Sequence, residues 1–229
     1  MYTPINTVLF DLDGTVLDTA PDLVAALNAV RLEQHYEPVS LEQMRPFISH
    51  GAGVMISKSF AIDKNHPDFE PLRQRMVALY AEHIADQTCL FPDMAEVLAT
   101  LEAWNIQWGI VTNKPAWLTV PLLVRLNLAR RATCVVSGDT LPQKKPDPTP
   151  LLYACELAQT TPAHCIYMGD AARDVEAGQH ANMRTLVALY GYLDPVHDNP
   201  TDWGATALLE KPIDLLTWLD SDKKGNPHN

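Results

Sequence analysis

Short apolar runs recur along the chain, separated by segments with a different spacing of polar residues. The first run, residues 5–10, is rich in β-branched residues and ends in Asp-Leu-Asp-Gly, which predicts a buried strand with carboxylates at its C-terminal end. From residue 91 onward, similar runs alternate with stretches of helical spacing. The strands expected there are 108–112, 134–137, 166–168 and 185–189. Apolar strands alternating with helices predict a parallel sheet covered on both faces.

The stretch after the first strand has helical spacing throughout. Apolar residues recur at helical intervals behind Thr19, the expected N-cap, with Pro21 in the first turn. Ser40 and Gln43 have the spacing of a capping box that opens a second helix. A further helix is expected over 68–86, where apolar residues again follow one face. The pattern therefore predicts an all-helical insertion.

Together these patterns predict an α/β protein with a Rossmann-like, parallel-sheet core and an all-helical domain inserted after the first strand. The core is expected to comprise residues 1–16 and 87–222, and the inserted domain residues 17–86. Residues 223–229 are polar and rich in helix breakers, so a disordered tail is expected there.

The composition excludes several classes of partner. The chain has 229 residues, of which 47% are apolar, and 17 Lys and Arg stand against 28 Asp and Glu, a formal charge of −11. Such a charge gives no long-range attraction to nucleic acid or to an anionic membrane, so neither is expected as a partner. An anionic substrate would need a local positive site. The sequence leaves a monomer and a homodimer equally open.

Location is predicted from two further features. The N-terminal residues lack the basic and apolar regions of a signal peptide, and no apolar run approaches the roughly 18 residues needed to cross a bilayer. The four cysteines form no metal-binding spacing, so we expect buried free thiols in a reducing compartment. These are Cys89, Cys134, Cys155 and Cys165. A soluble, cytoplasmic protein is predicted.

Polar residues suited to chemistry follow the ends of the expected strands. Ligands of an open parallel sheet bind outside the carboxyl ends of its strands, so these side chains should converge on one edge. The candidates are Asp11, Asp13, Thr112, Asn113, Lys145, Asp170 and Asp174. Four carboxylates brought together repel one another unless a cation neutralises them, and their oxygens suit Mg²⁺.

The remaining groups of this set suit phosphoryl transfer. Thr112, Asn113 and Lys145 are donors for the oxygens of a phosphoryl group. Asp11 and Asp13 lie two residues apart, and a turn at Asp13-Gly14 would separate their tasks. One carboxylate can attack phosphorus while the other transfers a proton.

Four motifs carry a family resemblance that extends over residues 5–220. The segments F-D-L-D-G-T (10–15), V-T-N-K (111–114), K-P-D-P (145–148) and G-D-x-x-x-D (169–174) resemble the motifs of the haloacid dehalogenase-like phosphatases, in order and at similar spacing. The helical insertion resembles the cap domain of that family.

The resemblance implies a role for each site residue. Asp11 would be the nucleophile and Asp13 the general acid and base. Thr112 and Lys145 would stabilise the phosphate and the aspartyl-phosphate, with Asn113 near the phosphate. Asp11, Asp170 and the backbone carbonyl of Asp13 would hold Mg²⁺, with Asp174 supporting the metal. Where the family often has Ser after the last Gly-Asp, this chain has Ala171, so one oxygen near the metal is missing.

Further segments resemble particular groups within the family and suggest a small phosphorylated metabolite as the substrate. T-N-K-P (112–115) and Y-G-Y (190–192) resemble the phosphoglycolate phosphatases. The segment 191–205 and S-H-G-A (49–52) resemble bacterial N-acetylmuramic acid 6-phosphate phosphatases of cell-wall recycling, which makes Ser49, His50 and Gly51 candidate substrate contacts in the cap.

Two alternatives stay open at this stage. A phosphosugar mutase of the same family would return the phosphoryl group to the substrate, and a non-catalytic phospho-acceptor module would keep it. Asp13 argues against the second, because such a module needs no acid or base beside its phosphoaspartate. Arg173 is expected at the surface rather than in the site, and Trp117 in the core.

Overall fold

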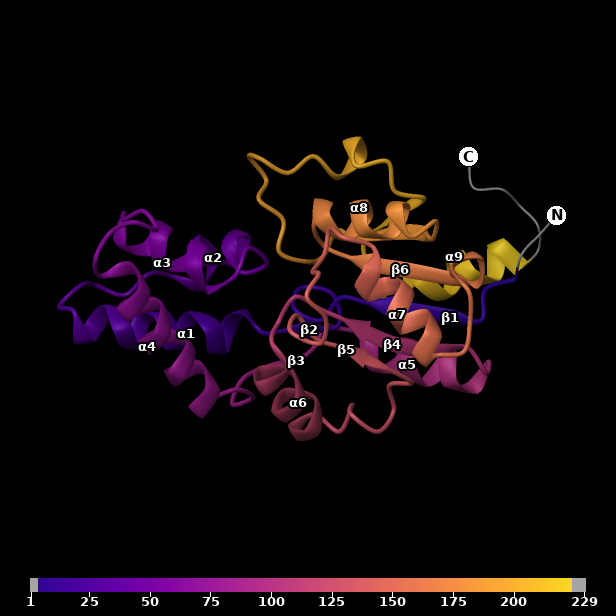
Figure 1. Ribbon diagram of the computed structural model, residues 1–229, viewed down its shortest axis with the longest axis horizontal. Coiled ribbons are helices and arrows are strands. Elements are labelled where there is room, and N and C mark those ends of the chain that lie inside the picture. Colours follow the sequence, from indigo (N-terminus) through magenta and orange to yellow (C-terminus); the bar gives the residue numbers. More distant parts are fainter. Residues whose placement is uncertain (1–3, 224–229) are drawn as a thin grey trace.

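A computed structural model describes residues 4–223, and within them six parallel strands form one sheet (Figure 1). In sheet order the strands are β5 (Val135–Val136), β4 (Gln107–Val111), β1 (Thr7–Phe10), β6 (Cys165–Gly169), β7 (Arg184–Ala188) and β8 (Ala207–Leu209). Five of these overlap the predicted strands, so the predicted α/β class with a parallel sheet is confirmed. The edge strand β8 was not predicted, because three residues show no readable period.

Side chains of the central strands alternate between two apolar layers. In β1, Val8 and Phe10 belong to one buried cluster and Leu9 to the other, as expected for a strand buried on both faces. The first layer contains α5 (Met94–Ala103), α6 (Ala116–Arg125) and α9 (Asp214–Lys223). The second contains α7 (Thr149–Leu157) and α8 (Ala172–His180). Short 3₁₀ turns occupy Pro162–His164 and Pro200–Asp202.

The helices within residues 20–82 lie together beyond one end of the sheet (Figure 1). They are α1 (Ala20–Glu33), α2 (Leu41–Met44), a 3₁₀ turn (Arg45–Phe47), α3 (Ala52–Phe60) and α4 (Phe69–Glu82). The predicted capping box of Ser40 and Gln43 is present. Thr19 does precede α1, but its side chain does not cap the helix and instead donates to Asp13.

A two-stranded ribbon connects this helical segment to the sheet. β2 (Leu17–Asp18) pairs antiparallel with β3 (Cys89–Leu90), a pairing that two-residue strands leave invisible in the sequence. Beside it, the buried carboxylate of Asp22 accepts hydrogen bonds from the N–H groups of Gln87 and Thr88 and from the Thr88 hydroxyl. These bonds fix the start of α1 against the returning chain. The predicted domain boundaries at 17 and 86 stay a prediction.

The cysteine prediction is wrong at one position. Cys134, Cys155 and Cys165 are buried free thiols, but Cys89 is exposed because it lies on the ribbon outside both apolar layers. Of the predicted tail, Lys223 ends α9 and the rest lies outside the described residues.

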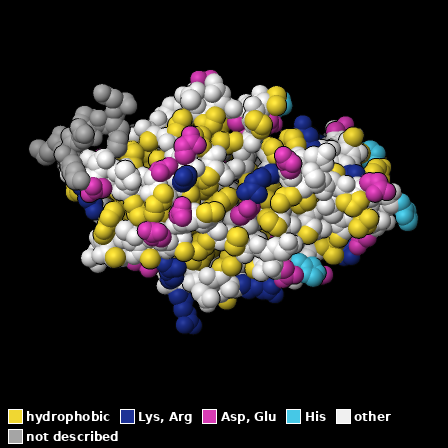
Figure 2. Space-filling view, turned by 180° about the vertical axis from the view of Figure 1, so that it is seen from behind, with side chains coloured by type: hydrophobic (Ala, Val, Ile, Leu, Met, Phe, Trp, Pro, Cys, Tyr) yellow, Lys and Arg dark blue, Asp and Glu magenta, His cyan; other side chains and the backbone are white. Residues whose placement is uncertain are grey.

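The surface shows no segregation of charge on the face seen in Figure 2. Acidic, basic and apolar side chains are interspersed there. Among residues 4–223, no helix combines the length and the apolar character that crossing a membrane requires.

Candidate active site

The carboxyl end of β1 presents two aspartates with different surroundings. The N–H of Asp11 donates to the carbonyl of Met168 (2.8 Å), which continues the β1–β6 pairing and holds Asp11 at the sheet edge. Asp11 is buried, and the N–H of Leu12 donates to its Oδ1 (2.8 Å). Gly14 has a φ of +86°, a conformation that favours glycine, so the chain turns where the sequence predicted. The turn separates Asp13 from Asp11.

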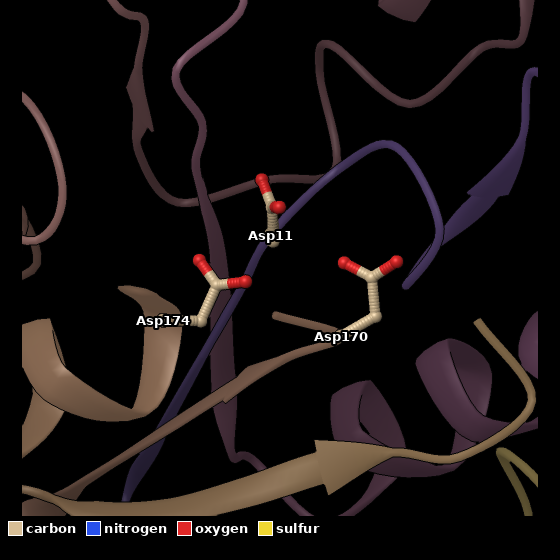
Figure 3. A group of neighbouring side chains, drawn as sticks. All are labelled: Asp11, Asp170 and Asp174. Carbon is tan, nitrogen blue, oxygen red and sulfur yellow. The ribbon is translucent and has the colours of Figure 1, made fainter. Parts of the chain in front are cut away.

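Asp11, Asp170 and Asp174 form a buried carboxylate cluster (Figure 3). Asp170 follows β6 and Asp174 lies in the first turn of α8, and one oxygen of each residue lies within 4.8 Å of the others. Burial, together with the charges of Asp11 and Asp174, raises the pKa of Asp170 to about 7. Oδ1 of Asp170 is buried and has no hydrogen-bond partner among residues 4–223. A buried oxygen without a partner, beside two further carboxylates, fits a hard divalent cation such as Mg²⁺.

Lys145 contributes a positive charge to this cluster. Its fully buried ammonium group lies 2.9 Å from Oδ1 of Asp11 and 2.7 Å from Oδ1 of Asp174, and it donates to the Tyr167 hydroxyl (2.7 Å). Burial opposes ionisation of Asp174, but Lys145 and Arg173 bring its pKa below the usual value. When all three carboxylates are ionised, these four groups alone carry a charge of −3 + 1 = −2. One divalent cation would neutralise that charge.

Asp13 belongs to a separate network. Nζ of Lys114 lies 2.9 Å from Oδ1 of Asp13, and the Thr19 hydroxyl donates to the same oxygen (2.7 Å). Lys114 also donates to the hydroxyl of Tyr80 (2.9 Å), which belongs to α4 of the helical segment. Burial disfavours the charged form of Lys114, but Asp13 and Tyr80 raise its pKa above the usual value. A cation shared with the helical segment therefore holds the Asp13 carboxylate.

Thr112 and Asn113 follow β4 and line a cavity together with Asp11 and Asp13. The Asn113 side chain donates to the carbonyl of Lys145 (3.0 Å) and accepts from its N–H (3.1 Å). Oγ1 of Thr112 accepts from the N–H of Lys114 (3.2 Å). Asn113 thus fastens the loop that carries Lys145. Contact of either residue with phosphate stays a prediction.

The helical segment brings Ser49, His50 and Gly51 close to these aspartates, and their contact with a substrate stays a prediction. All three line a cavity of about 790 Å³ between this segment and the sheet edge, with Asp11 and Asp13 also on its wall. The Ser49 hydroxyl donates to Oδ2 of Asp170 (2.7 Å). Gly51 has a φ of +84° at the start of α3.

A protein-family model matches most of this chain. The model of the haloacid dehalogenase-like hydrolases matches residues 8–188. The chain belongs to the haloacid dehalogenase-like hydrolases. The resemblance predicted from the four motifs, and with it the phosphatase class of enzyme, is confirmed.

Curated relatives of this haloacid dehalogenase-like hydrolase are named as two kinds of phosphatase. An N-acetylmuramic acid 6-phosphate phosphatase of Pseudomonas putida is 40% identical over 217 residues, covering 95% of this chain and 97% of the relative. A phosphoglycolate phosphatase of Xylella fastidiosa is 39% identical over 207 residues, covering 90% of each chain.

Solved structures share the fold of this hydrolase. A crystal structure from Haemophilus somnus, described as a predicted phosphoglycolate phosphatase, superposes with a TM-score of 0.82 at 24% sequence identity. The match covers 94% of this chain and 98% of that one. At this identity the match shows the fold alone, a Rossmann-like core with helices.

Several residues of this hydrolase's site were not predicted, and two residues were predicted wrongly. Arg173 is only partly exposed and lines the cavity, and Trp117 lines it with 54% of its surface exposed, so it lies outside the core. The signal for Arg173 was its place between two site aspartates, in the first turn of the helix after β6. Lys114 ends the V-T-N-K motif after β4, but no pattern marked Tyr80, because its contact with Lys114 joins segments far apart in the chain.

Proposed function

We propose that this protein is a Mg²⁺-dependent phosphatase that hydrolyses a small phosphomonoester through an aspartyl-phosphate on Asp11. The observation that carries the proposal is that the two aspartates at the end of β1 have different surroundings. Asp11 lies in a buried cluster whose charge suits one divalent cation, while Asp13 is held apart by Lys114 at the cavity wall. These different surroundings support attack by Asp11 and proton transfer by Asp13.

The chain's own residues account for both chemical steps. In the first, an oxygen of Asp11 forms a bond to phosphorus as the bond to the leaving oxygen breaks, and Asp13, in its protonated form, gives that oxygen a proton. In the second, Asp13 takes a proton from water, which attacks phosphorus and frees phosphate and the Asp11 carboxylate. Lys145 keeps Asp11 oriented and offsets negative charge beside it. Thr112 and Asn113 are proposed to contact the phosphate oxygens.

The same proposal assigns the metal ligands. Asp11, Asp170 and the backbone carbonyl of Asp13 would hold Mg²⁺, with Asp174 supporting the site. Bound Mg²⁺ would supply charge neutralisation and polarise the phosphoryl group. Lys145 lies between Asp11 and Asp174 and limits the repulsion between them before metal binds.

For the substrate we propose N-acetylmuramic acid 6-phosphate. The Pseudomonas putida relative carries that name, and the cavity of about 790 Å³ has room for a sugar beyond the phosphate. Trp117 offers an exposed aromatic face on the cavity wall, which suits a sugar ring. 2-Phosphoglycolate is the second candidate, because the Xylella relative is named for it, but a two-carbon acid would leave most of the cavity to water.

Residues 17–86 are proposed to act as a cap domain that closes over the substrate. Ser49 and Tyr80 already contact core side chains across the cavity, which supports this role. Closure would exclude bulk water from the phosphoryl group. A cytoplasmic location, and a monomer or homodimer, remain predictions.

Phosphate release tests the proposal. Purified protein with Mg²⁺ is assayed on N-acetylmuramic acid 6-phosphate, 2-phosphoglycolate, hexose phosphates and p-nitrophenyl phosphate. Asp11→Asn is expected to lower kcat at least about 10³-fold, since the nucleophile is lost. Asp93→Asn is the matched control, because Asp93 is exposed and has a positive φ that Asn tolerates. Activity of Asp11→Asn equal to that of the control would refute the assigned nucleophile.

Product analysis separates the phosphatase from a phosphosugar mutase. We expect free phosphate in an amount equal to the substrate consumed, with no isomer formed. A sugar-phosphate isomer formed in place of free phosphate would favour the mutase. A higher kcat/KM for 2-phosphoglycolate than for the muramic acid ester would favour the second substrate.

A further inference from the structure

The two oxygens of Asp170 have different surroundings. Oδ1 is buried without a hydrogen-bond partner among the described residues. Oδ2 accepts from the N–H of Tyr192 (2.9 Å) and from the Ser49 hydroxyl (2.7 Å). Figure 3 shows one oxygen of this carboxylate directed toward Asp11 and Asp174. Hydrogen bonds to one oxygen fix the direction of the other, so Ser49 helps to aim the free oxygen of Asp170.

Ser49 reaches Asp170 from a distant part of the chain. The two residues are 121 positions apart, and Ser49 lies in the helical segment, between its 3₁₀ turn and α3. The N–H of Gly51 donates to the carbonyl of Ile48 (2.9 Å), and the Ile48 side chain is buried among apolar residues. A closed turn with a buried anchor thus presents the Ser49 side chain. This hydrogen bond requires that the helical segment be seated on the core.

The residue after Asp170 offers no alternative donor. The side chain of Ala171 is only a methyl group, so it cannot donate a hydrogen bond to Asp170. Ala171 and Ser49 border the same small cavity of about 220 Å³, together with Asp170. In this chain the hydroxyl that binds Asp170 therefore comes from the helical segment.

We propose that Ser49 is a positioning residue that couples seating of the helical segment to binding of the divalent cation at Asp170. The inference rests on the proposed metal site. Because linkage is reciprocal, metal binding should stabilise the seated segment as much as seating improves metal affinity. Ser49 acts here through Asp170 rather than as a contact to the leaving group.

Calorimetric titration of Mg²⁺ into the metal-free, full-length protein tests the first half of the coupling. Ser49→Ala is expected to raise the Kd about tenfold, the usual lower range for losing a partner of a metal ligand. Ser49→Thr keeps the hydroxyl and should stay within about threefold of wild type. Ser57→Ala, in α3 of the same segment, is the matched control and should leave the Kd unchanged. A merely structural role would lower Tm in EDTA and leave the Kd for Mg²⁺ unchanged.

Hydrogen exchange tests the second half of the coupling, first in the wild-type protein and then in Ser49→Ala. Exchange of the His50 and Gly51 amides, which donate to the carbonyls of Phe47 and Ile48, should slow when Mg²⁺ binds the wild-type protein. The slowing should disappear in Ser49→Ala. Unchanged exchange in the wild type despite bound Mg²⁺ would overturn the coupling.

The outcomes separate this inference from the proposed function. If the wild-type protein binds no Mg²⁺, the proposed metal site is wrong and the inference falls with it. If wild type and Ser49→Ala bind Mg²⁺ with the same Kd, the metal site stands and the role of Ser49 is refuted.

Discussion

Replacing Lys145 by methionine should lower the stability of the metal-free protein, because it leaves buried carboxylates without their cation. The ammonium group is fully buried between Asp11 and Asp174, at 2.9 and 2.7 Å from their oxygens. Its removal changes the summed charge of these groups from −2 to −3 (three carboxylates, no ammonium) at buried positions where charge is poorly solvated. Breaking a buried ion pair from one side costs about 3–5 kcal/mol. For a chain of this length that corresponds to a fall in Tm of about 10 °C.

Thermal unfolding in EDTA at pH 8, followed by circular dichroism, measures this loss. Lys144→Met is the matched control, because Lys144 is the exposed neighbour and should change stability by less than about 0.5 kcal/mol. Lowering the pH should narrow the difference in Tm between Lys145→Met and the wild-type protein, since a carboxylate without its cation takes up a proton. Adding Asp174→Asn to Lys145→Met should recover part of the loss by removing one unpaired charge.

A small loss of stability in Lys145→Met would refute this prediction. If Lys145→Met lowers the free energy of unfolding by less than about 1 kcal/mol, or no more than Lys144→Met, the cluster does not depend on the buried ammonium. In that case the carboxylates would already be protonated or hydrated, and the charge argument for a divalent cation would lose its basis.

Three further predictions concern Gly14, Asp22 and Asp170. Gly14→Ala places a Cβ about 2.0 Å from Oδ2 of Asp170 at a φ of +86°, so it should cost at least about 2 kcal/mol in urea unfolding; an unchanged midpoint would contradict this. Asp22→Ala leaves the buried donors of Thr88 unpaired and should cost about 3 kcal/mol in the same assay, whereas a loss below about 1 kcal/mol would show that water replaces the carboxylate. In the metal-free protein, burial and two neighbouring carboxylates raise the pKa of Asp170 from 3.8 to about 7, so the folded state keeps a proton that the unfolded state loses. Stability should therefore fall as pH rises from about 4 to 7, by up to about 4 kcal/mol, and Asp170→Asn should flatten the profile of Tm against pH; an equal slope in the variant would assign the dependence elsewhere.

The sequence by itself determined the features that depend on neighbouring residues. Apolar runs of three to six residues predicted β1, β4, β5, β6 and β7, and the Ser40–Gln43 spacing predicted a capping box. The carboxyl ends of parallel strands meet at one edge, so the convergence of Asp11 and Asp170 also followed from the pattern. Local periodicity carries this information, because strand and helix place side chains with fixed repeats.

The tertiary structure decided which partners those side chains have. Lys114 pairs with Asp13, 101 positions away, while Lys145 pairs with Asp11 and Asp174, and no spacing in the sequence distinguishes the two lysines. The contact of Ser49 with Asp170 likewise depends on how the helical segment sits on the sheet. Such contacts join surfaces that become neighbours only after loop closure and packing, and the residues near each side chain in the sequence do not encode them.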